Sequence, residues 1–230
     1  LFIVFVMSLF VVSASFAQIN KNYDGTIPEV YQGSKSFIFM YSPFVSNNLG
    51  GAYAGSYSSY SDSMSASVSQ MFGVGFQYYV TSNISLGGGI SFGSGTWEPK
   101  LSSATVKNST TAFGISVDGN YHFKALYGVS PYLGLNVNMG TYSTTTDVTS
   151  GSTTSQYKNT GSSLGFGANF GFDWYFTPGL SLGGKYTLGM SMNSAPEYTE
   201  PSGSTTVTRT GPKSTGFGTG VASIMLNVHF

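Results

Sequence analysis

Large apolar side chains recur at every second position along most of the chain after residue 33. A period of two is typical of β-strands, whose successive side chains point to opposite faces, whereas a helix has a period near 3.6. The clearest run lies in residues 180–192, and residues 161–176 alternate likewise. In the second run, one face carries large side chains at nearly every position, Ala168 being the exception, and the other carries Gly, Ser, Asn and Asp, followed by Tyr175. The pattern predicts an all-β protein.

The same reading gives eight strands, at about 34–45, 67–80, 84–96, 110–123, 131–142, 161–176, 180–192 and 215–230. Three connections are short, at 81–83, 124–130 and 177–179, and four are long, at 46–66, 97–109, 143–160 and 193–214. Because short and long connections alternate strictly, one end of an up-and-down sheet would carry tight turns and the other large loops. This asymmetry is typical of outer-membrane β-barrels, with short periplasmic turns and longer extracellular loops.

Charge scarcity distinguishes a membrane barrel from a soluble one. Charged residues make up 8% of the chain, with nine basic and nine acidic residues, against roughly 25% in an average soluble protein. A lipocalin-like barrel would need many charges on its outer face, and nucleic-acid binding would need a basic surface. We therefore predict an eight-stranded antiparallel up-and-down transmembrane β-barrel over residues 33–230. It is expected to close because unpaired backbone groups in hydrocarbon cost several kcal/mol each.

The first 17 residues have the pattern of a secretory signal peptide. An apolar run over residues 1–12 is followed by small residues at Ser15 and Ala17, which is typical of such a peptide and its cleavage site. A membrane-spanning helix would need about 20 apolar residues. We predict cleavage after residue 17, a polar lead-in over residues 18–32 and export to the bacterial outer membrane. The first residue is not Met, so we expect the natural N-terminus to be longer.

The signal peptide, the eight alternating strands, the four long loops and the terminal Phe together resemble the small outer-membrane barrels of the OmpA transmembrane, OmpX and opacity-protein type. The last strand is the best local match, because apolar residues alternate through Leu226 and Val228 up to Phe230. The resemblance implies that these three residues form a signal for the barrel-assembly machinery. Gly218 and Gly220 fall on the outward face, where bulk is expected, so the sequence also predicts a bulge or a register change there.

Three ionisable residues share the inward face near the short turns: Asp118, Asp173 and Lys185. Pairing across residues 177–179 would place Lys185 diagonally opposite Asp173, and a buried charge needs such a partner. We expect a lumenal polar cluster that fills the barrel, with hydrogen-bonding neighbours at Asn136, Asn169 and Gln77. The alternative is an ion path through the same layer, although eight strands leave room for little more than side chains.

No catalytic or metal site is predicted. His122 and His229 belong to the fourth and eighth strands, on opposite sides of the expected ring, and Asp118 is about 13 Å from His122 along the strand. This spacing forms no Ser–His–acid triad. The Gly-x-Gly pairs lie within strands and precede no helix, which argues against a phosphate-binding loop. The chain contains no cysteine, and we expect no cofactor.

The long loops are the predicted recognition elements. Tyr53, Tyr57 and Tyr60 lie among Ser and Gly residues in the first loop, a composition that suits a binding surface but also any solvated loop. The last loop combines prolines with charges that suit lipopolysaccharide or a neighbouring protein. We predict a monomeric, non-enzymatic scaffold in outer-membrane lipid, whose loops contact an extracellular protein or host surface in adhesion or envelope integrity. A small porin-like channel is the first alternative, and a lipid-modifying envelope enzyme is the second.

Overall fold

The computed structural model describes residues 31–44, 70–98, 105–125, 128–177, 179–202 and 205–230. These ranges form ten β-strands. No helix within them is long and apolar enough to cross a membrane. The predicted signal peptide, residues 1–17, lies outside the described residues, as do Tyr53, Tyr57 and Tyr60.

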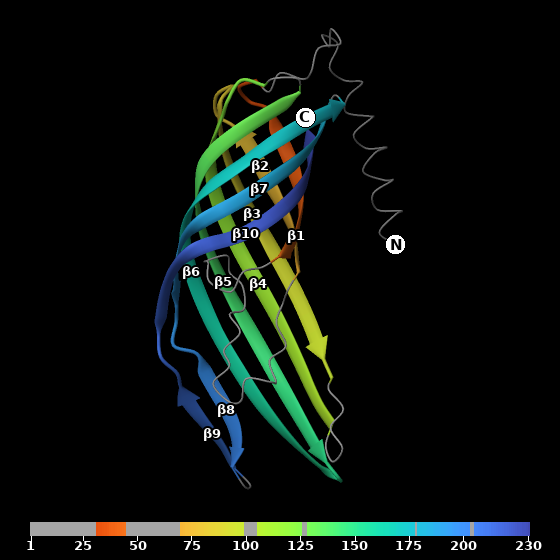
Figure 1. Ribbon diagram of the computed structural model, residues 1–230, viewed down its shortest axis with the longest axis vertical. Coiled ribbons are helices and arrows are strands. Elements are labelled where there is room, and N and C mark those ends of the chain that lie inside the picture. The colour runs from red at the N-terminus through yellow and green to blue at the C-terminus, as the bar shows by residue number, and fades with distance from the viewer. Residues whose placement is uncertain (1–30, 45–69, 99–104, 126–127, 178, 203–204) are drawn as a thin grey trace.

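Eight of the strands form a closed antiparallel ring (Figure 1). They are β1 (Lys35–Phe44), β2 (Met71–Tyr79), β3 (Ile84–Trp97), β4 (Thr105–His122), β5 (Val129–Ser150), β6 (Thr153–Thr177), β7 (Leu180–Asn193) and β10 (Ser214–His229). The ring follows chain order from β1 to β7, and β10 closes it by pairing with both β7 and β1. The predicted eight-stranded up-and-down barrel is thereby confirmed.

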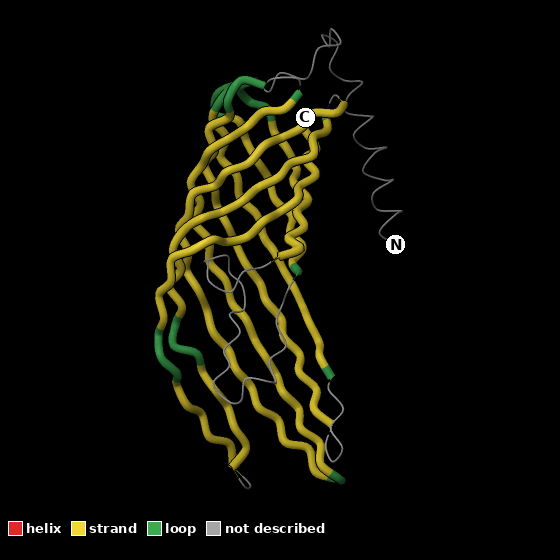
Figure 2. The backbone as a smooth tube through the Cα atoms, viewed as in Figure 1, coloured by secondary structure: helices red, strands yellow, loops and turns green. Residues whose placement is uncertain are grey.

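One end of the barrel, which we call the smooth end, carries the tight turns and both barrel termini (top of Figure 2). Gly179 has a φ of 76°, a conformation that glycine adopts without strain, and it lies in the turn between β6 and β7. Its carbonyl accepts a hydrogen bond of 2.8 Å from the backbone of His229. Phe230 and Lys35 exchange two backbone hydrogen bonds of 2.9 Å, so the last residue is tied directly to the start of β1.

The opposite end, which we call the loop end, is more regular than the sequence predicts. Residues 143–160, expected to form a loop, continue β5 and β6 as a paired hairpin that turns at Gly151. The last expected loop contains a second hairpin, β8 (Glu197–Ser202) with β9 (Thr205–Thr210), and β8 pairs with β6. These segments are rich in threonine, whose branched side chain suits strands, but they lack the apolar alternation on which the prediction rests.

The outer parts of five strands therefore form one sheet that extends beyond the barrel (lower part of Figure 2). We call it the protruding sheet and define it as residues 105–110 of β4, 143–150 of β5, 153–160 of β6, β8 and β9. Within its β4 part, Lys107 forms an ion pair of 3.2 Å with Glu98, the residue that follows β3.

The two faces of the barrel wall have the predicted chemistry. Phe166, Phe170 and Leu182 are 41%, 46% and 39% exposed on the outer face, whereas Gln77 and Asn169 are buried on the inner one. Aromatic side chains are exposed on the outer face near the smooth end, as expected for a membrane-interface girdle. They are Tyr78, Tyr121, Phe123, Trp174, Phe176 and Phe230.

The wall departs from strict alternation at two places. The pairing of β10 shifts register between Thr219 and Ala222, which confirms the irregularity predicted from the glycines there. Leu180 and Val228, both expected on the outer face, are only 3% and 4% exposed. They are ladder partners near the smooth end, where the β6–β7 register also shifts.

Candidate functional site in the barrel lumen

The first part of the lumenal site is an ion pair that spans the barrel. Lys185 Nζ, on β7, lies 3.6 Å from Asp118 Oδ1, on β4, and both side chains are largely buried. The other oxygen, Asp118 Oδ2, accepts a hydrogen bond of 2.8 Å from Asn120 Nδ2. Because β5 and β6 separate β4 from β7 in the ring, the lysine reaches across the lumen and not to an adjacent strand.

Asp173 is held by a different set of groups. Its Oδ1 accepts a hydrogen bond of 2.7 Å from Asn227 Nδ2, and its Oδ2 lies 3.7 Å from His122 Nδ1. The predicted ladder position of Asp173 opposite residue 183 is correct, and a Cβ at Gly183 would come within 2.8 Å of the carboxylate. Lys185, the expected ion-pair partner, instead forms its pair with Asp118, because the Asp173 carboxylate is directed at β10 and β4.

The two histidines are joined by the same network. His122 Nε2 lies 2.9 Å from Ser85 Oγ and 3.3 Å from Gln77 Nε2. His229 Nε2 lies 2.8 Å from Ser181 Oγ, which also accepts a hydrogen bond of 3.0 Å from Asn227 Nδ2. Asn227 therefore links the His229 side of the network to Asp173 and His122. The histidines were predicted to lie apart because their strands are on opposite sides of the ring, but in a narrow lumen the side chains between them bridge that distance.

Aromatic rings close the lumen around these histidines. Tyr79 and Tyr132 each lie 5.1 Å from His122, centroid to centroid, and Tyr175 lies 5.2 Å from His229. All five side chains are at most 9% exposed. We call them the tyrosine–histidine plug. The three tyrosines were not among the predicted lumenal residues, although their inward parity with Gln77, Asn136 and Asp173 is a sequence signal that identifies them.

The remaining predicted lumenal residues lie in separate hydrogen bonds. Asn169 Oδ1 accepts a hydrogen bond of 2.9 Å from Thr187 Oγ1, and Asn169 Nδ2 lies 3.5 Å from Asn120 Oδ1. Asn136 Oδ1 accepts one of 2.9 Å from Asn138 Nδ2. Asn169 therefore joins the Asp118 layer through Asn120, whereas Asn136 pairs with its neighbour on β5.

One arrangement in the lumen resembles a hydrolase triad, because His122 lies between Ser85 and Asp173. Its geometry does not suit acyl transfer. Ser85 is 0% exposed, so a substrate carbonyl has no approach to its Oγ. The 3.7 Å between His122 Nδ1 and Asp173 Oδ2 also exceeds hydrogen-bond distance. Among the described residues, no three His, Asp or Glu side chains group closely enough to hold a metal ion. The arrangement fills the lumen with packed side chains, and within it His122 Nδ1, His229 Nδ1 and Asn227 Oδ1 are buried without a hydrogen-bond partner.

The predicted assembly signal lies at the end of β10. Phe230 packs against Phe37 of β1, with 5.3 Å between ring centroids. Val228 is buried and Leu226 is half-buried. These positions describe how the last strand joins the first, and recognition by the assembly machinery stays a prediction.

Comparison with known proteins supports the architecture. The family model described as outer membrane protein beta-barrel domain matches residues 39–230. No curated protein sequence matches the chain.

Several solved structures are similar at low identity. Ail, the attachment invasion locus protein of Yersinia pestis, has 12% identity, covering 86% of this chain and 99% of that one, with a TM-score of 0.41. OprG from Pseudomonas aeruginosa has 14% identity, covering 89% and 99%, with a TM-score of 0.42. The outer membrane protein AlkL has 16% identity, covering 92% and 96%, with a TM-score of 0.45.

Proposed function

Because the chain belongs to the outer membrane protein β-barrel family, we propose that it is a non-enzymatic scaffold that presents binding surfaces outside the cell. The smooth end is then periplasmic and the loop end extracellular. The observation that carries the proposal is the contrast between these ends. Buried side chains close the periplasmic end, while the protruding sheet extends the extracellular end.

The protruding sheet supplies a surface suited to protein recognition. Every side chain of β9 is exposed, and among the described strands β9 pairs only with β8. Its sequence, Thr-Thr-Val-Thr-Arg-Thr, has high strand propensity. The outer edge of such a strand can pair with an extended segment of another protein. We infer an extracellular or host-surface protein as the partner, with adhesion as the consequence.

Adhesion of bacteria that express the protein tests this role. Cells would be applied to surfaces coated with laminin, fibronectin or collagen, and retained cells counted. We expect Val207→Pro to reduce binding strongly, because proline disrupts strand pairing along β9. Val207→Thr, which keeps a residue of high strand propensity at the same position of β9, is the matched control. Equal retention by the wild type and by a variant with residues 196–211 replaced by a short Gly–Ser turn would contradict the proposal.

A small channel is the second candidate, since Asp118, Asn120 and Lys185 form a polar layer across the lumen. The tyrosine–histidine plug favours the scaffold, because a conducting path would have to pass through buried rings. Single-channel recording in planar bilayers separates the two functions. We expect no reproducible current steps from the wild type.

A further inference from the structure

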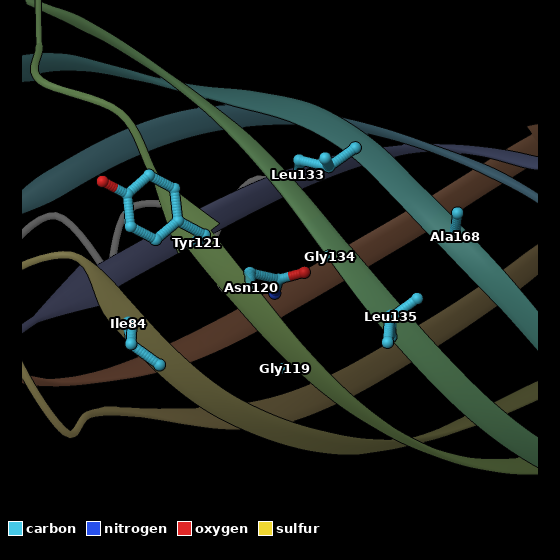
Figure 3. A pocket seen from close by; sticks show the side chains of 8 residues that line it. All are labelled: Ile84, Gly119, Asn120, Tyr121, Leu133, Gly134, Leu135 and Ala168. Atoms are coloured by element: carbon cyan, nitrogen blue, oxygen red, sulfur yellow. The ribbon is translucent and has the colours of Figure 1, made fainter.

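A groove of about 370 Å³ lies in the wall of the barrel near the periplasmic end, outside the lumen. It crosses four neighbouring strands, β3 to β6, and is lined by Ile84, Gly119, Asn120, Tyr121, Leu133, Gly134, Leu135 and Ala168. Figure 3 shows the apolar side chains around the positions of the two glycines. The groove includes Ala168, the one small residue among the large outer residues of its strand.

This groove exists because Gly119 and Ala168 have no large side chain, and not because the backbone is distorted. Gly119, Leu135 and Ala168 lie side by side in the ladders of β4, β5 and β6. Leu135 is 73% exposed and stands between the two small residues. A Cβ added to Gly119 would meet only Leu86 Cδ2 at 3.4 Å, an ordinary contact. Packing of the barrel therefore does not require glycine there, in contrast with Gly183 against Asp173.

The surroundings of the groove change from apolar to polar toward the periplasmic rim. Leu135 and Ala168 line the deeper part, while Tyr121 is one of the girdle aromatics and packs against Phe123 with 5.2 Å between centroids. Lys124 follows at the rim and is exposed, about 10 Å along the chain from Tyr121. An apolar groove that ends in an aromatic ring and a cation matches a lipid with an acyl chain and an anionic headgroup.

We propose that this groove binds one acyl chain of an anionic glycerophospholipid from the periplasmic leaflet, and that Lys124 pairs with its phosphate. The acyl chain lies between Tyr121 and Leu135, over Gly119 and Ala168. The proposal rests on the place of the barrel in the membrane and is independent of the surface-binding role.

Native mass spectrometry of the purified full chain tests the site. The protein would be released from detergent after addition of phosphatidylglycerol or of phosphatidylcholine with the same acyl chains. We expect one phosphatidylglycerol to remain bound to the wild type. Gly119→Leu and Ala168→Leu, which fill the groove, are each expected to reduce that adduct about tenfold. Lys124→Gln should keep one lipid bound but lose the preference for phosphatidylglycerol.

Two controls match these changes. Val74→Phe adds bulk to the outer face of β2, away from the groove, and Lys35→Gln removes another cation at the periplasmic rim. Both should retain the wild-type adduct. The difference in gel migration between unboiled and boiled protein verifies that each variant folds.

Three results would overturn the proposal. If the groove-filling variants bind lipid as the wild type does, the groove is not the lipid-binding site. If the control variants lose the lipid adduct to the same extent, the bound lipid is nonspecific. A wild-type dimer that the groove-filling variants abolish, without any lipid adduct, would assign the groove to a second copy of the chain.

Discussion

Two carboxylates in the described part of the chain are buried in the lumen, and they have different partners. Asp118 has a cation, Lys185, at 3.6 Å, whereas Asp173 has a neutral amide, Asn227, at 2.7 Å and His122 at 3.7 Å. A buried carboxylate depends on such partners, because removal of one leaves the charge without compensation. The contribution of each residue can therefore be separated by substitution.

Lys185→Met is expected to lower the free energy of unfolding by about 3–5 kcal/mol, since it leaves Asp118 buried without its cation. The urea midpoint in lipid vesicles measures the change. The double variant Lys185→Met with Asp118→Leu should recover most of the loss, because it removes both charges. An unchanged midpoint in the single variant would show that the ion pair does not contribute to stability.

Asn227→Ala is expected to cost about 1–3 kcal/mol, because Asp173 and Ser181 both lose a hydrogen-bond donor. Asn193→Ala is the matched control, since its amide donates to Ser214 at an exposed position near the loop end. The same urea titration compares the two variants. Equal midpoints would mean that the Asp173 network adds nothing beyond an exposed hydrogen bond.

The period of two predicts which side chains face the lumen, but it does not predict which groups they contact there. Parity alone places Asp118, Asp173 and Lys185 inside the barrel. Which carboxylate Lys185 reaches depends on the tilt and stagger of strands that are not neighbours in the ring, and neither quantity is encoded in one strand's pattern. The pairing of Lys185 with Asp118 therefore became visible only in three dimensions.

At the scale of the strands, prediction succeeds where one face carries large apolar side chains and fails where both faces are mainly polar. The predicted start of β7 at residue 180 is observed, while β5 and β6 run on through residues 143–160. There the ladders hold polar pairs such as Thr110 with Thr144 and Asn108 with Thr146. Such strands carry no apolar alternation, so composition alone assigned them to a loop.

Hydrogen–deuterium exchange tests the paired state of this hairpin. We expect backbone amides in residues 143–150 and 153–160 to exchange slowly, because they lie in a continuous β5–β6 ladder. Thr145→Pro removes one donor from the ladder and should accelerate exchange locally, while β7 keeps its protection. Fast exchange over the whole hairpin in the wild type would contradict an ordered protruding sheet.

The molecule as a whole combines a sealed base with an exposed extension. Closure of the ring was predictable, because an even number of strands brings the first and last together and hydrocarbon tolerates no open edge. A filled lumen was predicted from its polar residues, but the tyrosines that seal it were not, because inward tyrosines near a membrane interface were not separated from the outward girdle. Tyr78 and Tyr79 are adjacent in β2, yet they are 41% and 0% exposed.

This adjacent pair provides a direct test of the seal. Tyr79→Ala combined with Tyr132→Ala removes two rings that flank His122 and should turn a silent barrel into one with measurable current steps in planar bilayers. Tyr78→Ala removes a ring of the same size from the outer face and should leave the barrel silent. If the wild type already conducts as strongly as the double variant, the tyrosine–histidine plug does not close the lumen and the channel becomes the better function.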